Sequence, residues 1–133
     1  MVAGRMGFSV EIRARREADI AAAAAELQSA LAACKTCQSE MVLTVMKPPA
    51  RLDKRLIRIM EETAAAMGVE TRRMLSGASH DASPLSKVMP AAMLFVPSVL
   101  GISHSKDEYT RPEHLAAGAR LLANSLLRLD GMR

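Results

Sequence analysis

The chain has 133 residues, enough for one domain or for parts of two, and 50% of them are hydrophobic. Its net charge of +4 comes from scattered basic groups, and only 2% of its residues are aromatic, which argues against nucleic-acid binding because a nucleic-acid surface needs a basic face with stacking rings. We find no signal peptide and no apolar run long enough to span a membrane, so we expect a cytoplasmic protein without membrane contact.

The first part of the chain predicts a strand, a helix and a second strand. Apolar and polar residues alternate over Phe8–Arg13, which is typical of a strand. Arg16–Ala33 is rich in alanine, with larger apolar residues at helical spacing and acidic residues in its first turn. Glu40–Met46 is apolar and partly β-branched. This order predicts one βαβ-like half of a small α/β layer, whose open edge needs another half.

The two cysteines, Cys34 and Cys37, lie just after the predicted helix. Their spacing is that of a redox motif or of half a zinc site. No second pair of cysteines and no active-site helix pattern follows them. Chance placement at the end of a helix is therefore the favoured interpretation.

A stiff break at Pro48-Pro49 predicts a domain boundary, because the residue before each proline is pushed out of helical geometry. Beyond it, apolar residues recur at three and four positions from Leu52 to Met67, which predicts a helix that ends with Gly68 as its C-cap. The remaining elements expected are a short strand, a buried strand and a closing amphipathic helix, at Val69–Leu75, Ala91–Pro97 and His114–Leu129 respectively.

Two loops between these elements carry residues suited to a site. In residues 76–82, small residues allow a ligand to approach the backbone, and His80 with Asp81 forms a proton-active pair. Residues 97–105 follow the most apolar strand and contain His104, and strand-end loops are where α/β proteins place their sites. The structural alternatives are that His80 and Asp81 simply begin a helix and that His104 lies in a surface turn.

A complete metal centre is not evident in the sequence. A catalytic zinc takes three protein ligands, and a two-metal site adds bridging carboxylates, yet no HxD or HExxH pattern occurs. His114 falls in the first turn of the last helix, where capping or exposure explains it. Glu108 follows His104 by four residues in a loop, and we interpret it as holding the loop rather than binding metal.

Five motifs occur in order between Ser76 and Leu129: Ser-Gly-Ala-x-His-Asp-Ala, Pro-x-Ala-Met-x-Phe-Val-Pro-Ser, Gly-Ile-Ser-His-Ser, Glu-Tyr-Thr and a Gly-Ala-x-x-Leu helix. This region resembles the C-terminal part of the N-carbamoyl-L-amino-acid hydrolases, allantoate amidohydrolases and β-ureidopropionases, which are M20-type metallohydrolases. In addition, Phe8–Arg13 resembles a strand of that family reading Phe-Thr-x-Asp-x-Arg.

The resemblance implies an α/β (α+β) fold in two parts. Residues 1–46 would be the end of an inserted dimerisation (lid) domain, and residues 47–133 the C-terminal part of the metal-dependent catalytic domain. The implied activity is hydrolysis of C–N bonds in N-carbamoyl amino acids or in ureido substrates like allantoate by a metal-activated water. The implied cofactors are two divalent metal ions per site, Zn or else Mn, Co or Ni, and the implied assembly is a homodimer.

The resemblance also implies roles for three residues. His104 matches the family's last metal ligand, His80 matches a catalytic motif histidine beside the substrate, and Arg13 matches an arginine that grips the substrate carboxylate from the neighbouring subunit. The sequence departs from the family pattern at Ser79 and Leu100, which stand where glycines are usual. No counterparts of the other metal ligands or of the general base occur, so we expect the chain to be a fragment that is inactive by itself.

Two alternatives remain open at this point. The chain could be a non-catalytic α/β dimerisation or interaction module that pairs through the open edge of residues 1–46. It could also be one half of a split enzyme, in which a second chain supplies the missing ligands. The sequence does not distinguish the carbamoyl and ureido substrates from one another.

Overall fold

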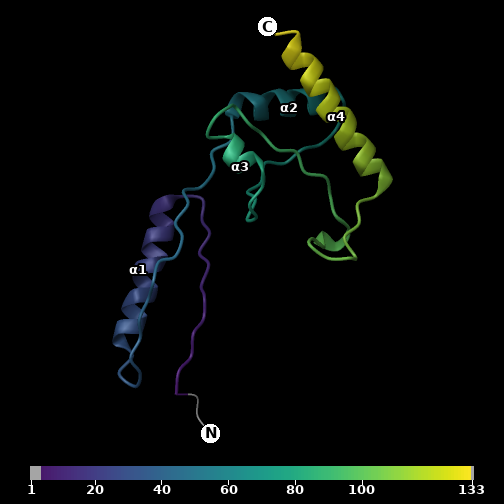
Figure 1. Cartoon of the computed structure of the whole chain (residues 1–133). Helices are drawn as coiled ribbons and strands as arrows, with labels where there is room; N and C mark the ends of the chain where they lie inside the picture. Colours follow the sequence, from purple (N-terminus) through teal and green to yellow (C-terminus); the bar gives the residue numbers. More distant parts are fainter. Residues whose placement is uncertain (1–3, 133) are drawn as a thin grey trace. The chain divides into compact units, whose positions relative to one another are not determined.

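The computed structural model describes residues 4–132, which form helices joined by extended segments (Figure 1). The helical elements in chain order are α1 (Glu17–Ala33), α2 (Lys54–Ala66), α3 (Ala82–Leu85), the 3-10 turn η1 (Val99–Gly101) and α4 (Pro112–Asp130). Across this described part, none of the helices is long and apolar enough to cross a membrane.

The chain divides into two compact units. The first comprises the residues up to Pro49 together with Leu75–Gly77. The second comprises Ala50–Met74 and the residues from Ala78 onward. The assignment of residues 1–46 and 47–133 to two domains of a larger enzyme stays a prediction, since a division into compact units does not say to which domain of a parent each belongs.

The helix of the first unit forms where its sequence predicts it. Arg16 is the N-cap of α1, and its guanidinium donates to the Asp19 carboxylate over 2.9 and 2.6 Å. Glu17 and Asp19 place negative charge in the first turn, where the helix dipole favours it. No residue of α1 is buried, so the high helix propensity of its many alanines, rather than packing, stabilises the helix.

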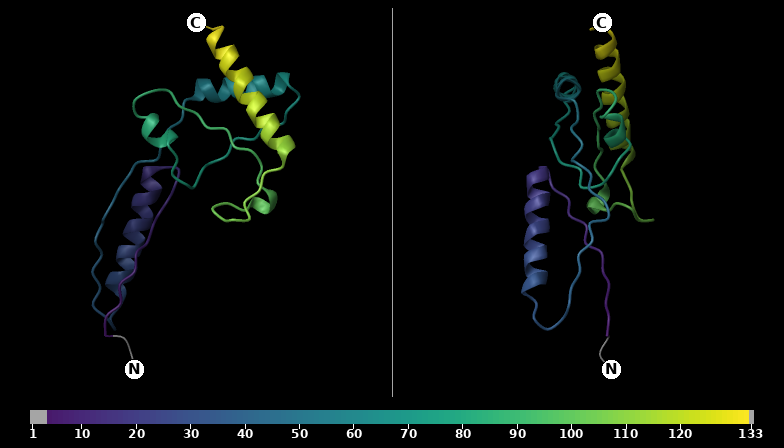
Figure 2. Two further views of the ribbon diagram at one scale, coloured as in Figure 1. Left: turned by 45° about the vertical axis from the view of Figure 1, so that its right-hand side comes forward. Right: turned by 60° about the vertical axis from the view of Figure 1, so that its left-hand side comes forward.

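The chain on either side of α1 is extended but forms no strand. The segment before α1 and the segment after it both run alongside the helix, in the direction opposite to it (Figures 1 and 2). The strands predicted at Phe8–Arg13 and Glu40–Met46 are wrong, since residues 4–132 contain no strand. A strand needs a neighbouring extended segment whose N–H and C=O groups pair with its own. The apolar side chains of the two segments stay largely exposed, Phe8 at 71% and Leu43 at 71%.

The second unit is organised around the contact of α2 with α4, which cross in Figure 1. Ile59 and Ala64 of α2 and Leu121 of α4 are its buried hydrophobic residues. The buried hydroxyl of Thr63 donates to the carbonyl of Ile59 over 2.7 Å, so its burial leaves no unpaired donor. The core of this unit therefore lies between the two helices.

Local signals define both ends of α2. The Asp53 carboxylate accepts from the N–H groups of Arg55 and Leu56 over 2.8 and 2.9 Å, as an N-cap does. At the other end Gly68 has a φ of +67°, and the N–H of Val69 donates to the carbonyl of Ala64 over 2.9 Å. This is a Schellman motif, and the predicted helix end at Gly68 is confirmed.

The strands predicted at Val69–Leu75 and Ala91–Pro97 are also wrong, because these segments pack on helices instead of pairing with one another. The Arg73 guanidinium donates to the Glu61 carboxylate of α2 over 2.5 and 2.7 Å, and it lowers the pKa of that carboxyl. The carbonyl of Ala91 accepts from the N–H of Asp53 over 2.8 Å. The α/β layer expected from the sequence is thus not confirmed.

The segment after Ala91 lies close to α4 at a glycine. A Cβ atom added to Gly118 would lie 2.5 Å from Cγ1 of Val96. We expect Gly118→Ala to lower the free energy of unfolding by about 1 kcal/mol, because overpacking costs more than the ~1 kcal/mol that alanine gains in a helix. Urea denaturation of the full chain measures this difference.

The matched control is Gly131→Ala at the end of α4, where the added Cβ would meet only carbonyl oxygens at 3.6 and 3.9 Å. This variant should be at least as stable as the parent chain, because the φ of −68° at Gly131 suits alanine. Adding Val96→Ala to Gly118→Ala should remove part of the loss, since the clashing methyl group is gone. Equal stability of Gly118→Ala and Gly131→Ala would contradict the close contact.

Candidate functional site

His104 lies in a loop that the chain closes on itself before α4. The N–H of Val99 donates to the carbonyl of Tyr109 over 2.8 Å, and the Ser98 hydroxyl donates to the carbonyl of Ile102 over 2.5 Å. His104 is exposed, and its backbone N–H donates to the Glu108 carboxylate over 2.9 Å. The interpretation of Glu108 as the residue that holds this loop is confirmed.

The loop contains three residues in the left-handed region, Leu100 at φ 57°, Gly101 at φ 69° and His104 at φ 56°. A non-glycine residue there costs about 1–2 kcal/mol, and Leu100 is 90% exposed, so no burial offsets the cost. Leu100 is the position where the resemblance expects glycine. Ser79, the other departure from the family pattern, does not have a positive φ and so carries no such strain.

Leu100→Gly is expected to raise the free energy of unfolding by about 0.5–1 kcal/mol, because glycine adopts a positive φ without the steric cost of a Cβ atom. Chemical denaturation of the full chain measures the change. Val88→Gly is the control, since Val88 is 82% exposed but has no positive φ. That variant should lose stability through the added freedom of the unfolded chain, and a similar loss in Leu100→Gly would contradict a steric cost at Leu100.

His80 lies at the start of the short helix α3. Its ring meets the ring of Phe95 edge-on, with centroids 5.4 Å apart and planes inclined by 68°, and the residue is half-buried. Its carbonyl accepts from the N–H of Ser83 over 2.8 Å, while Asp81 is the N-cap and makes no side-chain capping bond. A helix thus begins beside this pair, and Phe95 in addition orients the imidazole, while the role of His80 stays a prediction.

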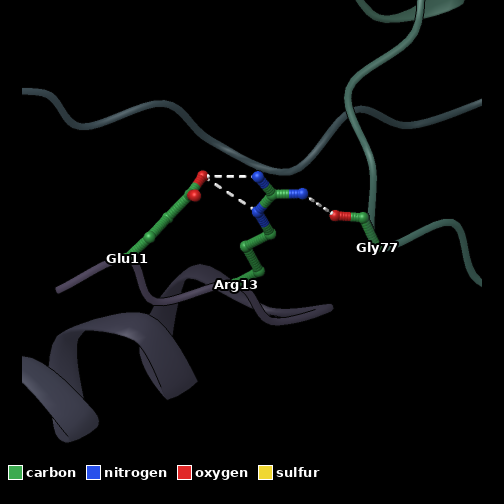
Figure 3. A network of polar contacts seen from close by, with 3 residues as sticks. All are labelled: Glu11, Arg13 and Gly77. Atoms are coloured by element: carbon green, nitrogen blue, oxygen red, sulfur yellow. Dashed lines mark hydrogen bonds and ion pairs between the residues drawn. The ribbon is translucent and has the colours of Figure 1, made fainter. Parts of the chain in front are cut away.

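Arg13 bridges two acceptors within the first unit, as Figure 3 shows. Its Nε donates to Oε1 of Glu11 over 2.9 Å, and its Nη2 lies 2.8 Å from the same oxygen. Its Nη1 donates to the carbonyl of Gly77, in the loop that also contains His80. Glu11 thus occupies the edge of the guanidinium formed by Nε and Nη2, and another carboxylate could bind this edge in its place.

Glu11 is not among the site residues predicted from the sequence. The signal that could have found it is its spacing of two from Arg13 in an extended segment, because such side chains lie on the same face. The contact with Gly77, 64 residues away, has no comparable local signal.

The residues present do not fit a complete metal centre. Within residues 4–132, no group of three or more His, Cys, Asp and Glu side chains could hold a metal ion. A catalytic zinc takes three protein ligands. His104 therefore supplies at most one ligand of such a site, and His114 lies exposed in the first turn of α4, apart from the two loops.

Comparison with known proteins supports the resemblance. The model of the peptidase family M20/M25/M40 matches residues 4–128, which is nearly the whole chain. The chain belongs to this family. The family membership predicted from the motifs is therefore confirmed. Members of the M20 family are hydrolases and are generally metal-dependent.

Three relatives show which enzymes the chain resembles in sequence. It is 37% identical over 92 residues to a ureidoglycolate hydrolase of Oryza sativa subsp. japonica, covering 69% of this chain and 19% of the relative. It is 44% identical over 81 residues to an allantoate amidohydrolase of Bacillus subtilis (strain 168), covering 61% of this chain and 20% of that relative. It is 30% identical over 129 residues to an N-carbamoyl-L-amino-acid amidohydrolase of Rhizobium meliloti, covering 93% of this chain and 30% of that relative.

The chain therefore spans between about a fifth and a third of the length of these relatives. No solved structure matches it.

Proposed function

We propose that this chain forms the C-terminal part of the active site of an M20 amidohydrolase that cleaves C–N bonds of ureido or carbamoyl substrates. The observation that carries the proposal is the family match over residues 4–128, which includes Arg13 and both histidine loops. The names of its relatives support the reaction type, since ureidoglycolate, allantoate and N-carbamoyl amino acids all contain a ureido group.

His104 is the proposed metal ligand. Its imidazole is exposed on a loop whose backbone is fixed by Glu108, which leaves the ring nitrogens of a neutral histidine available to Zn²⁺, Mn²⁺, Co²⁺ or Ni²⁺. Because the described residues do not complete a metal centre, the other ligands of the proposed two-metal site come from outside residues 4–132. By itself the chain is proposed to be inactive.

His80 is proposed to act on the substrate side of the same site. A half-buried imidazole held edge-on against Phe95 has a defined orientation, which a group that stabilises developing charge must have. At this position it donates a hydrogen bond to the oxygen on which charge develops as the C–N bond is attacked.

Arg13 is proposed to bind the substrate carboxylate across a homodimer interface. Its guanidinium already binds one carboxylate, that of Glu11, through Nε and Nη2. A substrate carboxylate fits the same edge in place of Glu11, because the planar fork matches two carboxylate oxygens. In this arrangement residues 1–46 belong to the dimerisation domain and residues 47–133 to the catalytic domain of a cytoplasmic enzyme.

The isolated chain is expected not to hydrolyse N-carbamoyl amino acids or allantoate with added Zn²⁺, Mn²⁺ or Co²⁺, because one histidine does not hold a catalytic metal. Release of the amino acid or of ammonia measures this. Turnover by the isolated chain that His104→Ala abolishes would contradict the proposal that the remaining ligands lie elsewhere.

The positive test uses a chimaera, in which this chain replaces the aligned region of the Rhizobium meliloti relative, which is 30% of that protein. The chimaera receives the rest of an active site from that protein and is expected to hydrolyse N-carbamoyl amino acids. A chimaera that folds, dimerises and binds metal but shows no turnover would contradict the proposed function.

The second candidate is a non-catalytic interaction module. The observation in its favour is the apolar surface of the first unit, where Phe8, Val42, Leu43 and Val45 are all more than half exposed. The same chimaera separates the two functions, because an interaction module restores assembly but contributes nothing to the chemistry at His104.

A further inference from the structure

The end of α1 brings two free thiols together. The Sγ atoms of Cys34 and Cys37 lie 3.0 Å apart, and both residues are exposed. Cys34 is the C-cap of α1, and its N–H donates to the carbonyl of Leu31 over 3.2 Å. The Ser39 hydroxyl donates to the same carbonyl over 3.2 Å. The turn between the cysteines is thus tied to the helix at both of its ends.

The two thiols differ in acidity because of their contacts. A hydrogen bond from Cys37 is the largest cause that lowers the pKa of Cys34, to about 7, and the Thr36 hydroxyl, at 3.5 Å, is the next. The same contact with Cys34 raises the pKa of Cys37. A thiolate is the reactive form of cysteine, so Cys34 has the features of a nucleophile, while Cys37 remains a thiol beside it.

The spacing of these cysteines is compatible with a redox motif, half a zinc site or, as the favoured interpretation, a chance pair at a helix end, because spacing does not say whether the two side chains meet. In the structure they do meet, on an exposed turn that a small molecule can reach. Neither residue is part of the proposed hydrolytic machinery, so a role for this pair is independent of the proposed function.

We propose that Cys34 and Cys37 form a thiol–disulfide exchange site, which takes low-molecular-weight disulfides as its substrates and closes to a disulfide within the chain.

The reaction has two steps. The Cys34 thiolate attacks one sulfur of the small disulfide, so that a bond between Cys34 and that sulfur forms while the original S–S bond breaks and one small thiolate leaves. Cys37 then gives its proton to solvent and attacks the sulfur of Cys34, which releases the second small thiolate. The dithiol of the chain is oxidised by two electrons, and the small disulfide is reduced to two thiols.

The test treats the reduced full chain at pH 7 with glutathione disulfide or with an aromatic disulfide whose released thiolate is coloured. The expected product of the parent chain, seen by mass spectrometry, is two hydrogen atoms lighter and carries no adduct. Cys37→Ser is expected to stop at a single mixed disulfide, because its nucleophile remains but the resolving thiol is absent.

The rates of the two single variants identify the nucleophile. At pH 7 a thiol of pKa about 7 is about 50-fold more ionised than one at the ordinary value of 9.0, and its weaker intrinsic nucleophilicity removes about 8-fold of that gain. Cys37→Ser should therefore react roughly fivefold faster than Cys34→Ser. In Cys37→Ser the serine hydroxyl can still donate to Cys34, which preserves the lowered pKa.

Two results would overturn the proposal. One is a parent chain that ends with two stable mixed disulfides, which would show that Cys37 does not reach Cys34 in solution. The other is equal rates for the two single variants, which would show that neither thiol is activated. Melting curves of both variants that match the parent exclude loss of the fold as the cause.

Discussion

His104→Ala in the chimaera is expected to lower kcat/KM for N-carbamoyl amino acids by at least about 100-fold. The reason is that loss of a metal ligand removes a group that holds the ion, and even changes to residues that only support ligands cost about 10- to 100-fold. Steady-state kinetics at a fixed concentration of Zn²⁺ measures the loss.

The matched control for this prediction is His114→Ala. His114 is also an exposed histidine of the second unit, but it lies in the first turn of α4 and outside both loops. Its replacement should change kcat/KM by no more than about twofold, which is within the range of a surface substitution. Similar losses in the two variants would show that His104 has no special role.

Arg13→Ala is the second substitution with a large expected effect. It should raise KM for N-carbamoyl amino acids by about 10- to 100-fold and leave kcat nearly unchanged, because a charge-assisted fork to a carboxylate contributes about 1.5–3 kcal/mol to the bound ground state and transition state alike. The kinetics of the chimaera, fitted for kcat and KM separately, measure this effect.

Two further variants test whether Arg13 binds substrate or only supports the fold. Arg13→Lys should give an intermediate KM, since lysine keeps the charge but not the fork. Glu11→Gln should lower KM, because the carboxylate that now binds the Nε and Nη2 edge no longer competes for it. A fall in kcat and in melting temperature with KM unchanged would contradict a role in substrate binding.

The three long helices, α1, α2 and α4, were predictable because each is specified by residues within it or next to it, whereas η1 was not predicted. Asp53 caps α2, Gly68 ends it through a positive φ, and Pro112 occupies the first turn of α4. These signals act over a few residues, so they need no knowledge of the rest of the chain. The prediction of α1 over Arg16–Ala33 likewise depends only on its own alanine-rich sequence.

The strands were not predictable in the same way. The alternation in Phe8–Arg13 indicates an extended conformation, but a strand also requires a partner for its backbone, and the described residues supply none. The segments from Val69 and from Ala91 lie against α2 and α4 instead, through Arg73 and beside Gly118. Pairing depends on chain neighbours that a local pattern does not identify.

For the site, the sequence identified the loops but not all of their contacts. Glu108 was recognised as holding the His104 loop because the two residues are near in the sequence. The contact of Arg13 with Gly77 and the meeting of Cys34 with Cys37 depend on how the chain turns, and spacing alone does not decide that.

The most direct test of the central claim, that His104 is a metal ligand of an M20 active site, is the metal content of the chimaera. The ion bound per subunit is measured after dialysis against metal-free buffer, for the chimaera and for its His104→Ala and His114→Ala variants. We predict that His104→Ala loses metal while His114→Ala retains as much as the chimaera. Unchanged metal content in His104→Ala, with the fold intact, would contradict the assignment of His104.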